Sequence, residues 1–379
     1  MDGTTLPFWT LLPFGGLLLS IAVVPTRHAA WWRKGYPWVS LGFGLPTLLY
    51  FLLLSHGWGP RYLHTLQEYV SFIVLLGSLF VVSGGILLAG HLDGSPAVNT
   101  VLLALGTILA SVVGTTGASL LLIRPLLQAN RHRRSRAHLV VFFIFLVSNV
   151  GGCLTPLGDP PLFLGYLRGV PFAWTLGLAG PWAFVSAALL AIFFVVDSGC
   201  FRREHGTFSG EAEGLLDPLR LEGIWNLLPL AGIVATVYLS GRYGWHERAP
   251  GAQEAVMLAL AGLSWRLTRR RIHEANRFNF HPIAEVAILF AGIFATMVPA
   301  LAILETLPSR WPGFHLSEPW QYFWATGLLS GFLDNAPTYL SFTALASGAL
   351  GVDAGHLGNL LAAGDGLGER LLAAVSLGA

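Results

Sequence analysis

The chain has 379 residues, of which 54% are hydrophobic and only 11% charged. Soluble domains carry about 25% charged residues, so this composition excludes a soluble globular protein and indicates a chain that lies largely in lipid. The net charge of +2 is too small to indicate nucleic acid as a partner. The two cysteines, Cys153 and Cys200, lie far apart without the spacing typical of a metal site.

A membrane-spanning helix needs about 20 mostly apolar residues. The first apolar stretch follows no basic region, so we predict a membrane helix rather than a cleavable signal peptide. Several later segments are too short or too interrupted to be plain spans. In chain order, the predicted segments are 6–24, 38–54, 69–90, 101–123, 139–150, 162–178, 182–196, 224–239, 255–267, 283–304, 320–346 and 357–377.

Arginines in short loops predict the orientation, because such loops stay in the cytoplasm. Arg124, Arg131, Arg133, Arg134 and Arg136 form the strongest cluster, with no acid between them. Further cytoplasmic loops are predicted around Arg27, Arg33 and Lys34, at Arg202–Arg203 and at Arg269–Arg271. This pattern predicts a multi-pass protein of a bacterial-type inner membrane with its N-terminus outside, and it leaves the loop at 168–171 outside.

The arginine cluster conflicts with a single crossing at 101–123, which would leave it outside. A re-entrant hairpin with its small, polar tip at 113–119 removes the conflict. The segment 320–346, which contains Asp334, is predicted as a second hairpin that enters from the outside. One polar hairpin from each side is typical of inverted repeats that meet near the membrane midplane.

The predicted domain organisation follows from this order of elements. N-terminal membrane helices (1–68) precede a first transport repeat (69–197). A cytoplasmic linker (198–223) then leads to a second repeat (224–379). The predicted fold class is an all-α polytopic membrane protein with inverted repeats, broken helices and two re-entrant hairpins.

The stretch 148–161 interrupts an apolar segment with three glycines, three prolines and several polar residues. Proline and glycine both favour a break in a helix. Backbone freed at membrane depth is tolerated only in protein or around an aqueous cavity, and such breaks hold the substrates of secondary transporters. The predicted ion- and substrate-binding residues are Ser148, Asn149, Gly151, Gly152, Thr155, Gly158 and Asp159 in this stretch, Thr115 and Thr116 at the first hairpin tip, and Asp334, Asn335 and Thr338 at the second.

The most specific of these predictions concern the carboxylates of Asp159 and Asp334. A carboxylate at membrane depth is costly and usually functional, and sodium prefers oxygen ligands as other hard cations do. We therefore predict sodium sites at Asp159 and Asp334. An alternative interpretation is that Asp159 caps a helix beginning at Pro160, and both roles can hold together. Asp197 is predicted as a helix-boundary residue.

Two motifs resemble signatures of the ion-transporter superfamily. The first is the Asn-x-Gly-Gly of 149–152 followed by the Thr-Pro-x-Gly-Asp of 155–159, and the second is the Asp-Asn-x-Pro of 334–337. The resemblance runs from about Tyr69 to the end of the chain and points to the NhaD-type sodium/proton antiporters and the citrate-transporter branch. It implies a secondary active transporter with no cofactor except sodium ions or protons as coupling ions.

Sodium/proton antiport is the preferred function. The alternatives are sodium- or proton-coupled transport of citrate or another carboxylate, an arsenite or oxyanion permease, and a membrane binding protein without transport. No nucleotide-binding or hydrolase motif stands in a suitable context, so no enzymatic activity is expected. The expected partners are the lipid bilayer, sodium, protons or a small carboxylate, and a second copy of the chain in a homodimer.

Two features depart from the resembled pattern. Pro160 and Pro161 stand where NhaD-type proteins commonly have a hydroxyl residue, which removes ligands that an antiporter would use. The chain also ends at Ala379, where relatives carry a counterpart of the first break. We therefore expect the second repeat to be incomplete at its C-terminus.

Overall fold

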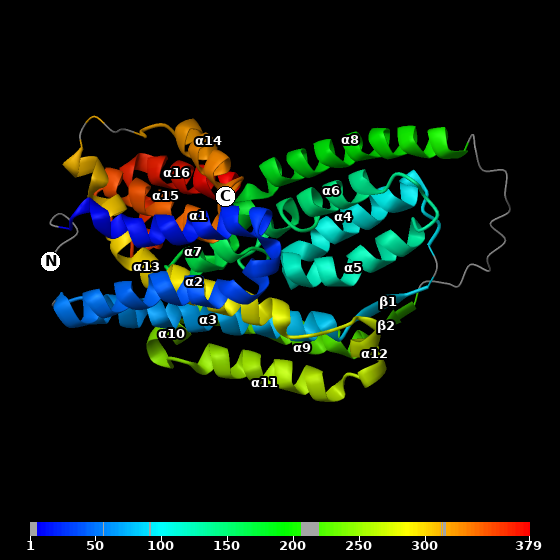
Figure 1. The fold of residues 1–379 in the computed structure, drawn as a ribbon, viewed down its shortest axis with the longest axis horizontal. Helices are drawn as coiled ribbons and strands as arrows, with labels where there is room; N and C mark the ends of the chain where they lie inside the picture. The colour runs from blue at the N-terminus through cyan, green and yellow to red at the C-terminus, as the bar shows by residue number, and fades with distance from the viewer. Residues whose placement is uncertain (1–5, 56, 91, 206–219, 312, 314–315) are drawn as a thin grey trace. The chain divides into compact units, whose positions relative to one another are not determined.

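The structure is a computed structural model that describes residues 6–55, 57–90, 92–205, 220–311, 313 and 316–379. It is built almost wholly of helices (Figure 1). Contacts divide the chain into two compact units that alternate along the sequence. Unit 1 comprises Met1–Ile73, Pro160–Pro171 and Phe280–Ala379, and unit 2 comprises Val74–Asp159 and Phe172–Asn279.

Unit 1 contains the N-terminal helices and the C-terminal part of the chain. Helix α13 packs against α2 and α15, and α15 also packs against α7 and α16. Helix α14 lies beside α16 (Figure 1). The helices are α1 (Leu12–Arg27), α2 (Ala29–Leu49), the first part of α3 (Gly59–Gly84), α7 (Pro160–Leu167), α13 (His281–Arg310), α14 (Pro319–Ser330), α15 (Asn335–Leu350) and α16 (Leu367–Gly378).

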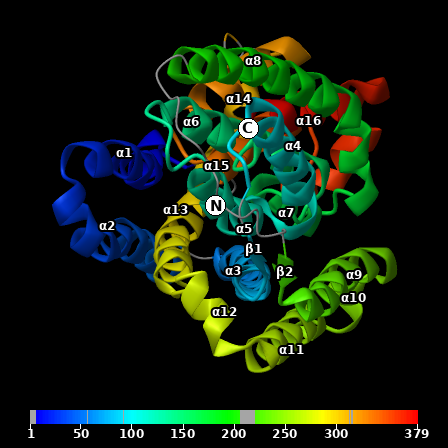
Figure 2. The same ribbon diagram turned by 90° about the vertical axis from the view of Figure 1, so that its right-hand side faces the viewer.

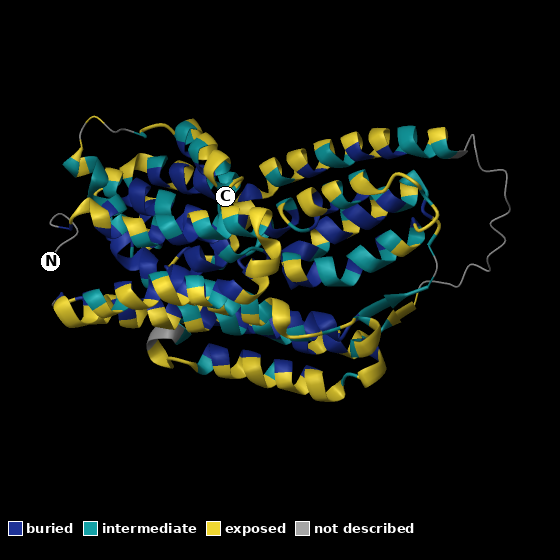
Figure 3. Cartoon of the chain, viewed as in Figure 1, coloured by how far each residue is buried: buried dark blue, intermediate teal, exposed yellow. Residues whose placement is uncertain are grey.

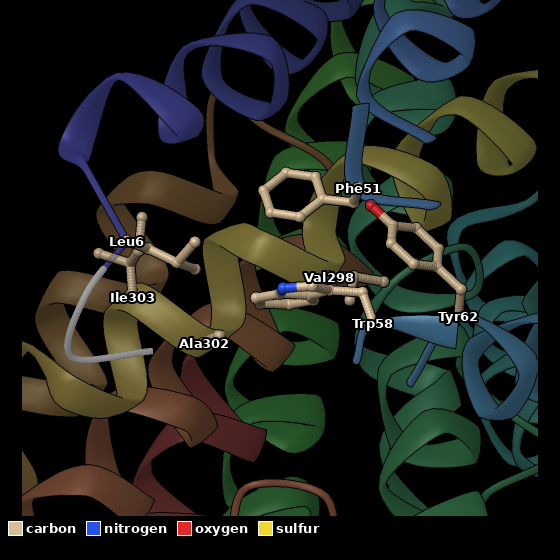
Figure 4. Packing of buried hydrophobic residues seen from close by; sticks show 7 residues of the cluster. All are labelled: Leu6, Phe51, Trp58, Tyr62, Val298, Ala302 and Ile303. Atoms are coloured by element: carbon tan, nitrogen blue, oxygen red, sulfur yellow. The ribbon is translucent and has the colours of Figure 1, made fainter. Parts of the chain in front are cut away.

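An aromatic cluster packs the start of α3 against α13 within unit 1 (Figure 4). The rings of Phe51 and Trp58 have their centroids 4.8 Å apart, and the Tyr62 hydroxyl donates to the Ala295 carbonyl at 3.1 Å. Phe51 lies in a π-helix, Tyr50–Leu54, that ends α2. Seven buried residues form the cluster: Leu6, Phe51, Trp58, Tyr62, Val298, Ala302 and Ile303.

Unit 2 contains the remaining helices and one small sheet. Helix α4 packs against α5 and α8, α6 packs against α8, and α9 lies beside α11 (Figure 2). Strands β1 (Leu87–Ala89) and β2 (Arg220–Glu222) pair antiparallel, with Leu88 opposite Leu221. The helices are α4 (Pro96–Val113), α5 (Thr115–Ala129), α6 (Ala137–Leu146), α8 (Ala179–His205), α9 (Leu227–Tyr243), α10 (Trp245–Arg248), α11 (Ala252–Leu267) and α12 (Arg270–Ala275).

Within the described residues, eight helical segments are long and apolar enough to cross a membrane. Few residues of the α8 segment are buried, and its apolar side chains lie on the surface (Figure 3). Exposed apolar side chains along a long helix are stable only in lipid. The chain is therefore an all-α polytopic membrane protein, as its composition predicts. The eight segments are Phe8–Arg27, Ala29–Leu54, Gly59–Gly84, Pro96–Val113, Ala137–Leu154, Phe172–Glu204, Ile224–Tyr243 and His281–Arg310.

Several predicted boundaries were wrong. The segment 162–178 is not one helix: α7 ends at Leu167 and a 3-10 helix covers Phe172–Leu178, because Gly169 adopts φ +88° and Pro171 cannot continue the hydrogen-bond ladder. Similarly, 357–377 divides into the 3-10 helices Leu357–Ala362 and Gly364–Gly366 and then α16.

The polar ends of helices were also misjudged. Arg33 and Lys34 lie inside α2 rather than in a loop, since only His28 separates α1 from α2. Helix α3 begins at Gly59 rather than Tyr69, and α8 extends to His205. Arginine, lysine, glutamate and glutamine have high helix propensity, so a polar residue does not by itself end a helix. Residues 206–219 of the predicted linker lie outside the described part of the chain.

Candidate ion and substrate site

The first hairpin turns at a single glycine. Helix α4 ends at Val113 and α5 begins at Thr115, while Gly114 between them has φ +81° and ψ 152°. Only glycine adopts this conformation without strain, and the turn lies inside the predicted tip 113–119. The Thr115 N–H donates to the Gly158 carbonyl at 3.1 Å, so the tip is attached to the broken stretch.

The broken stretch is a real interruption of a membrane helix. Helix α6 ends at Leu146, a 3-10 helix covers Val150–Leu154, and α7 begins at Pro160. The Thr155 hydroxyl accepts from the Leu157 N–H at 3.2 Å, and the Gly158 N–H donates to the Thr155 carbonyl at 3.0 Å. These local bonds replace part of the helical ladder, and they hold the chain in a turn just before Asp159.

Hydroxyl groups fasten the hairpin to this stretch within unit 2. The Ser111 hydroxyl donates to the Gly151 carbonyl and the Thr155 hydroxyl donates to the Ser111 carbonyl, both at 2.5 Å. The hydroxyls of Ser119 and Ser148 lie 2.9 Å apart. Four separate hydrogen bonds, counting that of Thr115, therefore join α4 and α5 to the break.

Glycines allow the backbones to approach here. A Cβ placed on Gly152 would lie 2.9 Å from Cγ2 of Thr115 and 3.0 Å from Cβ of Asp159. A Cβ on Gly158 would overlap the Gly152 carbonyl. A side chain at Gly152 would therefore force its neighbours to shift, and one at Gly158 would collide with the backbone, so carbonyl groups and small polar side chains line the contact.

The structure brings most of the predicted residues of the first site together in unit 2. Thr115, Gly152, Thr155 and Gly158 form one set of contacts, Ser148 and Gly151 are bonded to Ser119 and Ser111 of the hairpin, and the half-exposed Asp159 follows directly. Two predicted residues differ, because the side chains of Asn149 and Thr116 are exposed. A hard cation could use the Asp159 carboxylate and nearby carbonyls as ligands.

The second predicted site lies in unit 1, at the turn between α14 and α15. The Asp334 carboxylate accepts from the Ala336 N–H at 3.2 Å and so caps α15. The Thr338 hydroxyl donates to the Asp334 carbonyl at 2.8 Å, and Asn335 Oδ1 lies 2.7 Å from the Ser330 hydroxyl. Asp334 is thus a helix cap, a role that does not prevent its second oxygen from binding a cation.

Sequence reasoning missed a buried ion pair in unit 1. It left Arg168 in an outside loop, but the guanidinium of Arg168 and the carboxylate of Glu68 are joined by two hydrogen bonds, at 2.8 and 2.9 Å. The two side chains are only 7% and 4% exposed. The signal in the sequence is Glu68, the single acid in the segment that becomes α3. A carboxylate inside a membrane helix indicates a positively charged partner, but the sequence does not say which residue it is.

Sequence reasoning also missed a polar network in unit 2. Asp197 was placed at a helix boundary, yet its carboxylate is fully buried. One oxygen lies 2.5 Å from Nη1 of Arg133 and 2.8 Å from Nε2 of His138. The other accepts from Nδ2 of Asn99 at 2.9 Å. The network joins α4, α6 and α8 at the arginine-rich end of the unit.

Further contacts extend this network. Asn130 donates to Asn99 Oδ1 at 2.7 Å, and Arg133 also lies 3.4 Å from a Glu204 oxygen. Among the described residues, no group of three or more histidine, cysteine, aspartate or glutamate side chains is arranged to hold a metal ion. Hydrogen bonds and charge pairing hold the network together.

The chain was compared with known families. The sequence profile of a family described as "Putative citrate transport" matches residues 3–379, which is almost the entire chain. No curated protein matches the chain.

Proposed function

Because the chain belongs to this citrate-transport family, we propose that it is a secondary active transporter that carries citrate or a similar small carboxylate across a bacterial-type inner membrane. The observation that carries the proposal is the interruption of a membrane helix at 147–159, fastened to the tip of the α4–α5 hairpin. Interrupted helices of this kind are where secondary transporters bind substrates and coupling ions.

The proposed binding chemistry uses two helix starts. Helix α7 begins directly after Asp159, and α15 begins directly after Asp334. The start of a helix carries partial positive charge and free N–H groups that attract a carboxylate. The adjacent aspartates bind the coupling cation, sodium or a proton. The bound cation neutralises the aspartate, so that no negative charge repels the substrate, and the N–H groups at the helix starts then bind the substrate carboxylate.

The proposed topology completes this scheme. The N-terminus lies outside, and the hairpins α4–α5 and α14–α15 re-enter from opposite sides as parts of two inverted repeats. The support is the positive charge of the loop between α5 and α6, which favours the cytoplasm. Cysteines introduced at Arg134 and at Trp320 should then react with impermeant reagents from opposite sides of the membrane.

Sodium/proton antiport is the second candidate, and one observation favours it. The break and both hairpin tips, residues 107–123, 148–160 and 327–345, contain two aspartates but no lysine or arginine. Without a coupled cation, such a site attracts cations rather than anions. In this candidate function, Asp159 and Asp334 alternate between protonated and sodium-bound forms without any carboxylate substrate.

Reconstituted proteoliposomes distinguish the two functions. They would be given labelled citrate with an inward sodium gradient, with a pH gradient, or with neither. Citrate accumulation that requires either gradient supports the first proposal. Sodium-driven change of internal pH without citrate supports antiport. Vesicles that show neither flux, although the protein is inserted, would contradict both.

The aspartates provide the second part of the test. Asp159→Asn and Asp334→Asn should each abolish coupled flux, because the amide cannot exchange a proton or hold a cation with a full charge. Asp93→Asn is the matched control, since Asp93 is an exposed acid of the same chain. Equal transport by all three variants would remove both carboxylates from the mechanism.

A further inference from the structure

Helix α7 is short and therefore rigid, so fixing its last residue also fixes the position of its first residue. It has eight residues, Pro160–Leu167, and at 1.5 Å per residue it is about 12 Å long. Asp159 directly precedes it. A rigid rod of this length moves as one piece, so an anchor at its C-terminal end also fixes Pro160, the residue bonded to Asp159.

The C-terminal end of α7 is held by a buried ion pair. The Arg168 guanidinium donates through Nε and Nη2 to the two oxygens of Glu68 on α3, at 2.8 and 2.9 Å. A two-bonded arginine–carboxylate pair is directional as well as strong. Arg168 also follows the last turn of α7, where a positive charge complements the helix dipole.

Backbone contacts hold the same end within unit 1. The Gly358 N–H donates to the Arg168 carbonyl at 3.2 Å, and the Val170 N–H donates to the Gly165 carbonyl at 3.0 Å. Gly169 has φ +88° and ends the helix. The side of α7 also packs closely against α15: a Cβ on Gly165 would lie 3.2 Å from Cζ of Tyr339.

We propose that Glu68 and Arg168 are positioning residues, which fix the end of α7 and thereby hold the turn before Asp159 in its binding conformation. The inference deepens the proposed function, on which it rests. A buried ion pair is weak evidence for stability, because apolar residues of similar volume often replace it without loss. Two directional hydrogen bonds fix the orientation of the end of α7, which apolar packing would not do. This gives the pair a role other than stability.

The two native cysteines provide a test that does not depend on the substrate. Cys153 lies in the 3-10 segment of the break, and Cys200 lies in α8. Both are half-buried. The rate at which N-ethylmaleimide alkylates each of them would be followed by mass spectrometry in membranes that contain the wild type, Arg168→Lys or Glu68→Gln. Arg33→Gln, which removes an exposed charge from α2 of the same unit, is the control.

The proposal expects a several-fold faster alkylation of Cys153 in Arg168→Lys and Glu68→Gln, with Cys200 unchanged. The half-saturation concentration of the transported ion or citrate should rise several-fold, while the maximal rate per inserted protein changes less. The reversed pair, Glu68→Arg with Arg168→Glu, should restore part of both properties if it inserts.

Two results would overturn the proposal. Equal acceleration at Cys153 and Cys200 would mean that the pair only stabilises the fold, and unchanged alkylation at both would mean that it positions nothing. If the wild type transports neither citrate nor sodium, the proposed function fails, but the cysteine rates still decide whether the pair controls the break.

Discussion

The two compact units each bury an arginine–carboxylate pair, and the pairs differ in how many partners they have. In unit 1, Glu68 has both oxygens bonded to Arg168, and the half-exposed His64 lies 3.7 Å from one of them. The charges of Asp353 and Glu305 also act on Arg168. In unit 2, Asp197 contacts Arg133, His138 and Asn99 at once. Unit 1 concentrates the hydrogen bonds of its buried charges in one pair of residues, and unit 2 distributes them over several.

This difference predicts different responses to substitution. If one member of an isolated buried pair is removed, the other charge is left without compensation. If one member of a network is removed, the remaining groups keep part of their hydrogen bonds. The isolated pair suits a directional anchor, whereas the network suits a joint between several helices.

The largest expected effect is on the isolated pair. Arg168→Met should lower the free energy of unfolding by about 3–5 kcal/mol, because Glu68 remains buried and unpaired. The double variant Glu68→Met with Arg168→Met should recover most of this loss, since neither charge remains. Chemical denaturation in detergent micelles measures both. If the single and double variants lost equal stability, the loss would not come from an unpaired buried charge, and the contrast drawn between the two units would fail.

The network should be less sensitive. Asp197→Asn should cost about 2 kcal/mol, the range for a hydrogen bond to a charged group. The amide oxygen still accepts from Arg133, which also keeps its contact with Glu204 at 3.4 Å. The same denaturation assay applies, with the exposed Asp93→Asn expected within about 0.5 kcal/mol of wild type. A loss as large as that of Arg168→Met would contradict the distributed character of the network.

Close backbone packing in unit 2 should give a comparable or smaller effect. Gly152→Ala places a Cβ against Thr115 and Asp159, and overpacking of this kind costs about 1–3 kcal/mol. Gly262→Ala in α11 is the control, because no atom lies within 4 Å of its added Cβ. It should gain up to about 1 kcal/mol from helix propensity. Transport and thermal stability would be measured for both variants. A loss in Gly152→Ala alone would show that the close packing at this site, and not the replacement of a glycine as such, causes the effect.

The smallest effect concerns a histidine that lies outside the polar networks. Neither ring nitrogen of His273 has a hydrogen-bond partner among the described residues, and the ring packs against Trp265 with the ring centroids 4.4 Å apart and the planes tilted by 34°. Burial lowers the pKa of His273 below its usual 6.5. The unfolded chain therefore binds a proton more readily, so this histidine contributes stability above pH 6.5 that is lost as the pH falls toward its folded pKa.

His273→Gln should accordingly flatten the dependence of stability on pH just below 6.5. The measurement is the unfolding free energy of wild type and variant at neutral and mildly acidic pH. An unchanged slope would show that His273 titrates in the folded state as it does in water.

The sequence by itself determined the class of protein and the places where its helices break. Low charge content and long apolar segments require a lipid environment, and glycine and proline interrupt a helix through their own backbone geometry. The turn at Gly114 and the interruption before Pro160 were therefore predictable, because each depends on residues that are neighbours in the chain.

Only the tertiary structure decided which charges are buried and what they bind. Arg168 and Glu68 are 100 positions apart, and Asn99 and Asp197 are 98 apart. No local pattern relates residues so far apart, and a charged residue at a helix end looks the same whether it faces water or a partner. The burial of Arg168 and of Asp197 was missed for this reason, since a charge is stable inside the protein only where the fold supplies its counterpart.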